Sequence, residues 1–207
     1  FEKSGIININ LSNPLPSFKK PKKFTLDDGR YSFKKISYGK NYITGISNQS
    51  FELQPQKGLN IPNSLFNSSL QEKKYNKYIN LVKNWGIDSI GLSYIQNHKT
   101  IDKIKNKFPK LIITSKIENL EGLNNIEKIC DSSDVIMIDR GDLSAELGEE
   151  RLFSSILKII KAANKYGKPV IMATENLDSM IIRSSPNKSE IMSLGLSRYF
   201  KVDCVML

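Results

Sequence analysis

The sequence predicts an α/β fold in which a small all-β lobe precedes a larger part built on a parallel sheet. Over residues 1–63, short runs of alternating apolar and polar residues lie between turn residues, which is typical of β-structure. From residue 64 onward, short apolar strands alternate with helical patterns. At 207 residues with 39% hydrophobic content, the chain is long enough to bury the core that both parts require.

The predicted β-lobe of residues 1–63 contains two clear alternating runs, at residues 6–11 and 42–46. Turn signals occur at Asp27-Asp28-Gly29 and at Gln56-Lys57-Gly58, where glycine can adopt positive φ. A small β-barrel or sandwich is expected here, with Pro62-Asn63 as the exit hinge.

The second part, residues 64–207, is predicted to hold five strand–helix units. Helical spacing follows a capping box at Ser69–Glu72 and is clearest over residues 152–163, a helix closed by Gly167 and Pro169. Five such units imply a parallel sheet, either doubly wound or a β/α barrel, and both place active residues at the carboxyl ends of strands. The strands are expected at residues 87–94, 111–118, 135–138, 170–173 and 202–207, with further helices near residues 101–108, 123–130 and 177–182 and after Pro186.

Composition argues against several classes of protein. The longest apolar runs, such as Val135–Ile138, are far shorter than the ~20 residues that cross a bilayer, so no membrane association is expected. The net charge of +10 comes from lysines that are scattered apart from residues 19–23, so nucleic acid is not expected as a partner. Two cysteines suggest no disulfide framework, and a cytoplasmic location is expected. Because the chain starts at Phe1 and ends in an apolar run at Leu207, we also expect it to be incomplete.

Polar residues follow the predicted strands at one topological end. Lys116 and Glu118 are two residues apart in a strand, so they project to one face, while Ser115 and Ile117 project to the other. Taken alone, such a pair is more often a strand-end salt bridge than a site. Polar residues also follow the other strands, which favours a shared site: Ser93-Tyr94, Asp139-Arg140-Gly141-Asp142 and Thr174-Glu175.

The residue types at these strand ends suit an anionic, phosphorylated keto or enol acid. Glu118 and Asp142 are hard oxygen ligands that could hold Mg²⁺. Lys116 could stabilise charge on a phosphoryl group or an enolate. Gly141 would let backbone N–H groups approach an anion, and Thr174 supplies a hydroxyl for orientation or proton relay.

Several segments resemble, in order, the core motifs of the pyruvate kinase family. Further segments resemble the inserted β-domain of the family, the start of the helix that follows the core motifs, and the final barrel strand. The resemblance therefore spans nearly the whole chain. The core segments are Ser-Lys-Ile-Glu-Asn-Leu-Glu-Gly at 115–122, Arg-Gly-Asp-Leu at 140–143 and Gly-Lys-Pro-Val-Ile-Met-Ala-Thr at 167–174, and the others are residues 26–29, 57–62, 186–190 and 203–207.

The resemblance implies transfer of the phosphoryl group of phosphoenolpyruvate to ADP, which gives pyruvate and ATP. It also implies a partial TIM-type β/α barrel, made of the fourth to eighth strands, behind the end of the β-domain. The first three barrel strands, which carry the ligands of K⁺, and the carboxyl-terminal regulatory domain would be missing. A homo-oligomer is expected for the parent protein.

The resemblance also assigns roles to individual residues. Glu118 and Asp142 would be the Mg²⁺ ligands, and Lys116 would be the catalytic group that stabilises the transition state. Lys57 would reach the nucleotide from the β-lobe, and Thr174 would lie near the protonation step. The residues expected to bind the substrate are Ser93, Lys116, Arg140, Gly141, Asp142 and Thr174.

The chain departs from the family pattern at several positions. Extra carboxylates at Asp139, in place of a small residue, and at Glu175, in place of glutamine, predict weaker binding of phosphoenolpyruvate. The other departures are Tyr94 for phenylalanine, Gln96 for arginine, Ser144 for glycine, and Ser193 and Leu196 for Asp and Asn.

Two alternative functions remain open. One is a Mg²⁺-dependent pyruvate or oxaloacetate lyase, against which the β-lobe with Lys57 argues, because a lyase needs no nucleotide clamp. The other is a degenerate, non-catalytic homologue. An open five-stranded barrel would expose sheet edges, so the 207 residues alone are not expected to turn over substrate.

Overall fold

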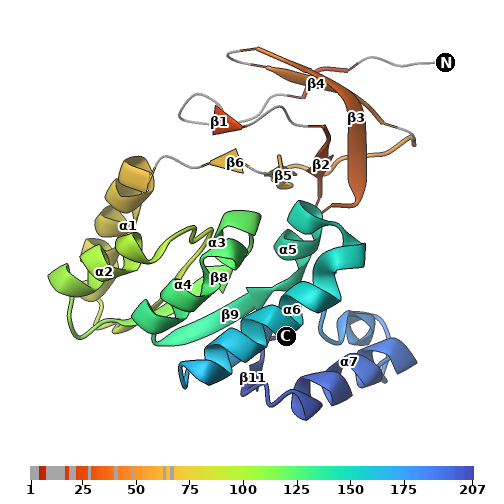
Figure 1. The fold of residues 1–207 in the computed structure, drawn as a ribbon. Helices are drawn as coiled ribbons and strands as arrows, with labels where there is room; N and C mark the ends of the chain where they lie inside the picture. The colour runs from red at the N-terminus through yellow and green to blue at the C-terminus, as the bar shows by residue number, and fades with distance from the viewer. Residues whose placement is uncertain are drawn as a thin grey trace.

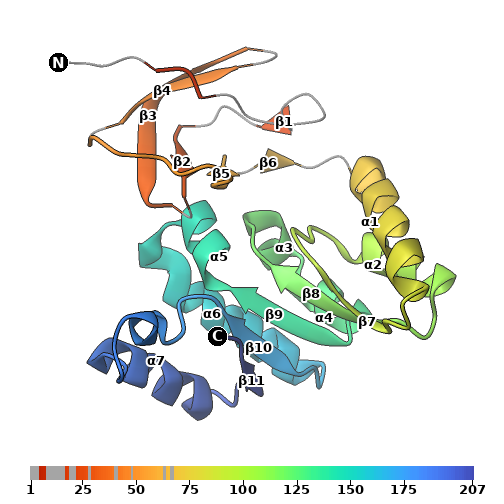
Figure 2. The ribbon, with the colours of Figure 1, turned by 180° about the vertical axis from the view of Figure 1, so that it is seen from behind.

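The computed structural model describes residues 5–7, 17–18, 22–27, 29–39, 42–47, 49–62, 64–65 and 68–207. Strands from the first sixty residues form a β-lobe that lies above the carboxyl ends of the strands of a parallel sheet flanked by helices (Figure 1). The lobe keeps this position in the view from behind (Figure 2). No helix of the described ranges is both long and apolar enough to span a membrane.

The β-lobe contains a four-stranded antiparallel sheet in the order β4-β3-β2-β5. Its small core is aromatic, with the rings of Phe24 and Phe33 stacked at 4.5 Å between centroids. The strand predicted at 42–46 is confirmed by β4, whereas most of the run at 6–11, together with Asp28 and Asn63, lies outside the described residues. Closure into a barrel or sandwich, and the domain boundary at residue 63, stay predictions. The strands are β2 (Phe24–Leu26), β3 (Tyr31–Tyr38), β4 (Ile43–Ser47) and β5 (Leu59–Asn60), and a separate antiparallel pair joins β1 (Ser17–Phe18) to β6 (Ser64–Leu65).

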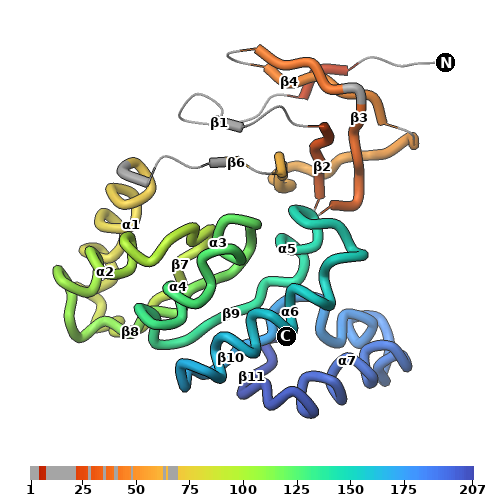
Figure 3. Tube along the Cα trace, in the orientation of Figure 1, coloured from red at the N-terminus to blue at the C-terminus, as the bar shows by residue number. Residues whose placement is uncertain are grey.

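The second part is a five-stranded parallel sheet in the order β11-β10-β9-β8-β7, which confirms the α/β class. Over the described residues this sheet is open, with edges at β7 and β11, and is compatible with part of a β/α barrel. The colours in Figure 3 advance across it in chain order. The strands are β7 (Ser89–Leu92), β8 (Ile112–Ile117), β9 (Val135–Asp139), β10 (Val170–Ala173) and β11 (Cys204–Val205).

The helices follow the predicted pattern with three differences. The helix expected over 123–130 is broken at Asn125 into two short helices, and the helix expected near 177–182 is only a short 3₁₀ helix. Strand β9 passes directly into a helix, α5, that was not predicted. The capping box expected at Ser69–Glu72 involves a side chain outside the described set, and α1 begins at Ser68. The helices are α1 (Ser68–Lys83), α2 (His98–Lys107), α3 (Leu120–Asn124), α4 (Ile126–Ser132), α5 (Arg140–Leu147), α6 (Glu149–Lys165) and α7 (Lys188–Tyr199), with the short 3₁₀ helix η1 (Asp178–Ile181).

Successive side chains of β8 point alternately to the hydrophobic core and to the candidate site. Ile113 and Ile117 are fully buried in the main core, and Ser115 accepts a 2.7 Å hydrogen bond from Ser133 at the end of α4. This face of the strand is therefore covered by helices. Lys116 lies between these positions in the strand, so its side chain points to the opposite face, as the two-residue period predicts.

The β-lobe contacts the sheet domain through α5. Gly29, at φ +90°, lies in the turn between β2 and β3, and a Cβ added there would be 3.4 Å from both Cα and Cβ of Ala145. Strand β5 also lies against α5. The helix that starts at the carboxyl end of β9 thus supports the lobe directly above the strand ends.

Candidate active site

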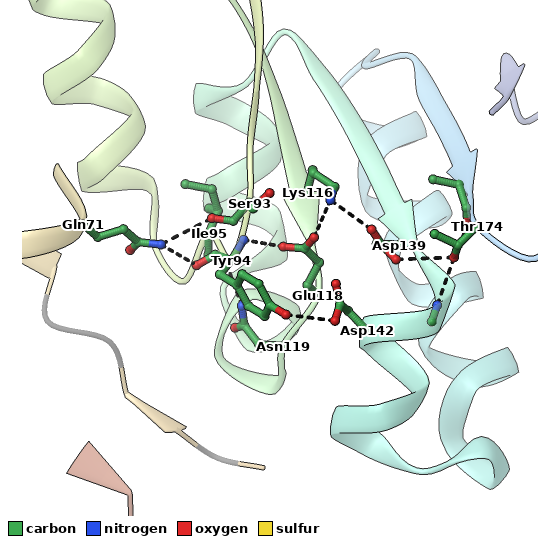
Figure 4. A network of polar contacts seen from close by, with 12 residues as sticks. Gln71, Ser93, Tyr94, Ile95, Lys116, Glu118, Asn119, Asp139, Asp142 and Thr174 are labelled. Atoms are coloured by element: carbon green, nitrogen blue, oxygen red, sulfur yellow. Dashed lines mark hydrogen bonds and ion pairs between the residues drawn. The ribbon is translucent and has the colours of Figure 1, made fainter. Parts of the chain in front are cut away.

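Three carboxylates and one ammonium meet at the ends of β8 and β9 and in the first turn of α5 (Figure 4). Glu118, Asp139 and Asp142 each offer an oxygen, and these oxygens all lie within 4.8 Å of one another. Lys116 Nζ lies 2.6 Å from Oε1 of Glu118 and 3.0 Å from Oδ2 of Asp139. The predicted site residues on β8 and α5 are therefore brought together. The salt bridge between Lys116 and Glu118, which was the alternative for the pair taken alone, is also present.

Strand register explains why Asp139 joins this cluster. Ile117 of β8 is paired with Ile138 of β9, so Glu118 and Asp139 are each one residue further along neighbouring strands. Paired residues of a parallel sheet project to the same face. Asp139 was among the strand-end residues that favoured a shared site, but it was given no role there beyond a departure from the family pattern.

Burial shapes the electrostatics of the Lys116–Glu118 pair. Desolvation raises the pKa of Glu118 to about 7, against the lowering effect of the Lys116 ammonium and of the Tyr94 backbone N–H. For Lys116, burial alone would lower the pKa, but the bonds to Glu118 and Asp139 outweigh it and bring the pKa to about 12. Lys116 is therefore a permanent cation at neutral pH.

Tyr94 is a hydrogen-bond donor to two of the carboxylates, a role that the sequence analysis missed. Its hydroxyl donates to Oδ1 of Asp142 at 2.8 Å, and its backbone N–H donates to Oε2 of Glu118. Burial and the neighbouring Asp142 carboxylate raise the pKa of this hydroxyl above its usual range, so it remains a donor. Tyr94 has φ +55°, which is uncommon for a residue with a side chain, and Gln71 Nε2 donates to its carbonyl at 3.1 Å.

The loop after β10 supplies Thr174 and has a constrained backbone. Thr174, Glu175 and Leu177 all have positive φ. The Thr174 hydroxyl accepts a 3.0 Å hydrogen bond from the Gly141 N–H and lies 3.3 Å from Oδ1 of Asp139. Thr174 and Gly141 therefore belong to the site, whereas the Glu175 side chain is exposed and lies outside the carboxylate cluster.

Arg140 holds this loop in place. Its guanidinium donates to Oδ1 of Asn176 at 2.7 Å, to the carbonyl of Thr174 at 3.1 Å and to Oγ of Ser193 at 2.8 Å. All three guanidinium nitrogens are thus engaged by protein groups. In this structure the guanidinium positions the Thr174 loop, and its role in substrate binding stays a prediction.

Three other residues singled out in the sequence lie around the cluster. Lys57, the predicted nucleotide-binding residue, pairs with Asp27 at 2.7 Å in the β-lobe. Ser93 accepts a hydrogen bond from the Tyr75 hydroxyl through its carbonyl, which fixes the end of β7. Gln96 donates to the carbonyl of Ser64 at 3.0 Å, between the sheet domain and the connection to the β-lobe.

The donor set fits a hard divalent cation such as Mg²⁺. Carboxylate oxygens are the ligands that this ion prefers. Oε1 of Glu118 is fully buried and, within the described part of the chain, its contact is the ion pair with Lys116 rather than a well-directed hydrogen bond. A buried carboxylate oxygen whose contact is a cation suits a metal ligand.

The chain is similar to known proteins over most of its length. The family model of the pyruvate kinase barrel domain matches residues 2–207. A pyruvate kinase from Hypocrea jecorina is 34% identical over an alignment of 189 residues, with 88% of this chain and 35% of that protein covered. One from Dictyostelium discoideum is 30% identical over 207 residues, with 97% of this chain and 41% of the relative covered.

A solved structure shows the same fold. The crystal structure of a pyruvate kinase from Cryptosporidium parvum matches 90% of this chain and 41% of its own, with a TM-score of 0.77 and 29% identity. The chain thus spans about two fifths of the length of these proteins. With a family model that covers nearly every residue, the chain belongs to the pyruvate kinase family.

Proposed function

We propose that the protein transfers the phosphoryl group of phosphoenolpyruvate to ADP, which gives pyruvate and ATP. The observation that supports this function is the meeting of Lys116, Glu118 and Asp142 at one edge of the sheet, within motifs that resemble those of the family. Family membership, rather than the fold alone, selects this reaction from the many that β/α folds support.

Glu118 and Asp142 would hold Mg²⁺, which when bound neutralises charge on the substrate oxygens and orients them. The Tyr94 hydroxyl fixes the Asp142 carboxylate, and the Tyr94 N–H fixes Glu118. Both carboxylates are therefore held in place before any ligand arrives. This preorganisation lowers the reorganisation needed at the moment of reaction.

Lys116 would stabilise the phosphoryl group during its transfer. As the bond between phosphorus and the enol oxygen breaks, a bond forms to an oxygen of the ADP β-phosphate, and negative charge spreads over the equatorial oxygens. The ammonium, with its raised pKa, stays charged throughout. It would exchange its contact with Glu118 for the phosphoryl oxygens.

Thr174 would act at the second step. The enolate left by phosphoryl transfer takes a proton at its methylene carbon to become pyruvate. The Thr174 hydroxyl is fixed by the Gly141 N–H, and the Arg140 guanidinium binds the Thr174 carbonyl. This arrangement would hold the hydroxyl against the substrate.

Lys57 would bind the phosphates of the nucleotide from the β-lobe. Its ammonium pairs with Asp27 but remains 41% exposed, so it can exchange this partner for a phosphate. The contact between Gly29 and Ala145 keeps the lobe beside α5, which also carries Asp142.

The test is formation of pyruvate from phosphoenolpyruvate by the protein as its gene encodes it, with Mg²⁺, with and without ADP. We expect formation that depends on ADP and is abolished in Lys116→Met. Lys105→Met is the matched control, since this lysine also pairs with an aspartate but at the opposite end of β9. It should keep full activity.

Other outcomes would contradict the proposal. Pyruvate formed from oxaloacetate, but not from phosphoenolpyruvate, would favour the lyase. Absence of turnover with either substrate would favour a non-catalytic homologue. The 207 residues alone, measured in parallel, are expected to be inactive, because the parallel sheet of the described residues is open and exposes its edges.

A further inference from the structure

Asp139 is the residue of the cluster that the proposed reaction does not use. Its side chain is nearly buried and faces Glu118 across neighbouring strands. Two buried carboxylates this close repel each other unless a cation lies between them. In this structure the Lys116 ammonium does so, since it contacts both.

The charge of the cluster points to a second cation. Three carboxylates share a mostly buried space with one ammonium, so the cluster carries net negative charge once two or more of the carboxylates are ionised. The hydroxyl and the backbone N–H of Tyr94 donate to Asp142 and Glu118, and the Thr174 hydroxyl lies beside Asp139; these three groups are neutral. A divalent ion would balance this charge.

The geometry also leaves oxygens directed at the centre. Oε1 of Glu118 is fully buried and its contact is the lysine. Oδ1 of Asp139 lies 3.3 Å from the Thr174 hydroxyl, but that hydroxyl has one proton and is closer, at 2.7 Å, to the carbonyl of Ala173. Asp139 thus keeps an oxygen able to bind a metal.

We propose that Asp139 is a third carboxylate ligand of the divalent cation, so that the protein binds the ion before the phosphorylated substrate arrives. This inference rests on the proposed function for the identity of the site. A site with two carboxylates fills its remaining positions with water and substrate oxygens. A third carboxylate replaces one of these and adds a full negative charge, which makes the affinity for the ion less dependent on the substrate.

The test is a titration of the metal-free protein with Mn²⁺, without phosphoenolpyruvate or nucleotide, followed by electron paramagnetic resonance of free Mn²⁺. Asp139→Ala, which restores a small residue, and Asp139→Asn, which keeps the shape, should both weaken binding at least tenfold. The matched control is Asp134→Asn. Asp134 lies at the opposite end of β9 and also pairs with a lysine, Lys105, at 2.7 Å, so its loss should leave Mn²⁺ affinity unchanged.

A second measurement distinguishes direct binding of the ion by Asp139 from a long-range effect of its charge. Water proton relaxation counts the waters on bound Mn²⁺, and Asp139→Ala should gain one. Mn²⁺ affinity within twofold of the unmodified protein in both variants would overturn the proposal. Tighter binding would also overturn it, because Asp139 would then act only as a counter-ion of Lys116.

The two proposals fail in different ways. Mn²⁺ binding that depends on Asp139 in a protein that makes no pyruvate would refute the proposed function and keep this inference. Pyruvate formation by a protein whose Mn²⁺ affinity does not change when Asp139 is substituted would keep the proposed function and refute this inference.

Discussion

A substitution of Gly122 by alanine tests how the strand ends are held together. Gly122 lies in α3, and a Cβ added there would be 2.5 Å from the carbonyl oxygen of Ile95, a distance that real Cβ atoms do not adopt. Gly122 and Ile95 are both buried and the clash is with backbone, so relief requires α3 or the loop after β7 to move. Overpacking of this kind costs about 1–3 kcal/mol.

The chain offers a matched control in Gly195, in the helix α7. No atom lies within 4 Å of a Cβ added at this position. Gly195→Ala should therefore show only the gain in helix propensity, a stabilisation of about 0.5–1 kcal/mol. The same gain would offset part of the cost at Gly122, so the two variants should differ by about 1–3 kcal/mol in free energy of unfolding.

Urea unfolding at neutral pH measures this difference as a change in midpoint at constant slope. Gly122→Ala should also lower activity, because Ile95 follows Tyr94, whose hydroxyl and N–H fix the carboxylates. If Gly122→Ala were as stable as Gly195→Ala, the close approach of α3 to Ile95 would not be a constraint, and the reasoning would be refuted.

Four further predictions concern the site itself. Lys116→Met should abolish phosphoryl transfer while Mn²⁺ still binds, and lost Mn²⁺ binding would show that the lysine is structural. The double variant Glu118→Ala with Asp142→Ala should lose little more activity than either single variant, because two ligands of one ion act as a unit; additive losses of activation free energy would indicate separate roles. Burial raises the pKa of Glu118 in the folded state, so ionisation of this carboxyl opposes folding. Without divalent cations, the free energy of unfolding relative to that of Glu118→Gln should therefore fall by about 3 kcal/mol as the pH rises from 4.5 to 7. A difference between the two proteins in urea unfolding that did not change with pH would contradict this. Arg140→Lys should speed amide hydrogen exchange over residues 174–177, since lysine cannot form the same fork of hydrogen bonds, and unchanged exchange would argue against the positioning role.

Local pattern was sufficient to predict most of the fold. The strands at 135–138 and 170–173 and the long helix over 152–163 follow from apolar runs and helical spacing, and β9, β10 and α6 confirm them. Helix α5 escaped prediction because it has eight residues, includes Gly141 and lacks a side-chain cap at Asp139. A short helix of this composition has no amphipathic pattern to detect.

Only the part of the site that follows from the alternation of side chains within one strand could be predicted from the sequence. That Lys116 and Glu118 share a face follows from the two-residue period of a strand, whereas placing Asp139 beside them requires the register between β8 and β9. The bond from Tyr94 to Asp142 joins residues 48 apart and depends on the positive φ of Tyr94, which no local pattern indicates.

The proposed reaction can be measured as transfer of a labelled phosphoryl group from phosphoenolpyruvate to ADP by the protein as its gene encodes it. We predict label in ATP in a one-to-one ratio with pyruvate, and no label above background in Lys116→Met. Label that remained in phosphoenolpyruvate, or that appeared as inorganic phosphate beside pyruvate, would contradict the assignment of Lys116, Glu118 and Asp142 to phosphoryl transfer.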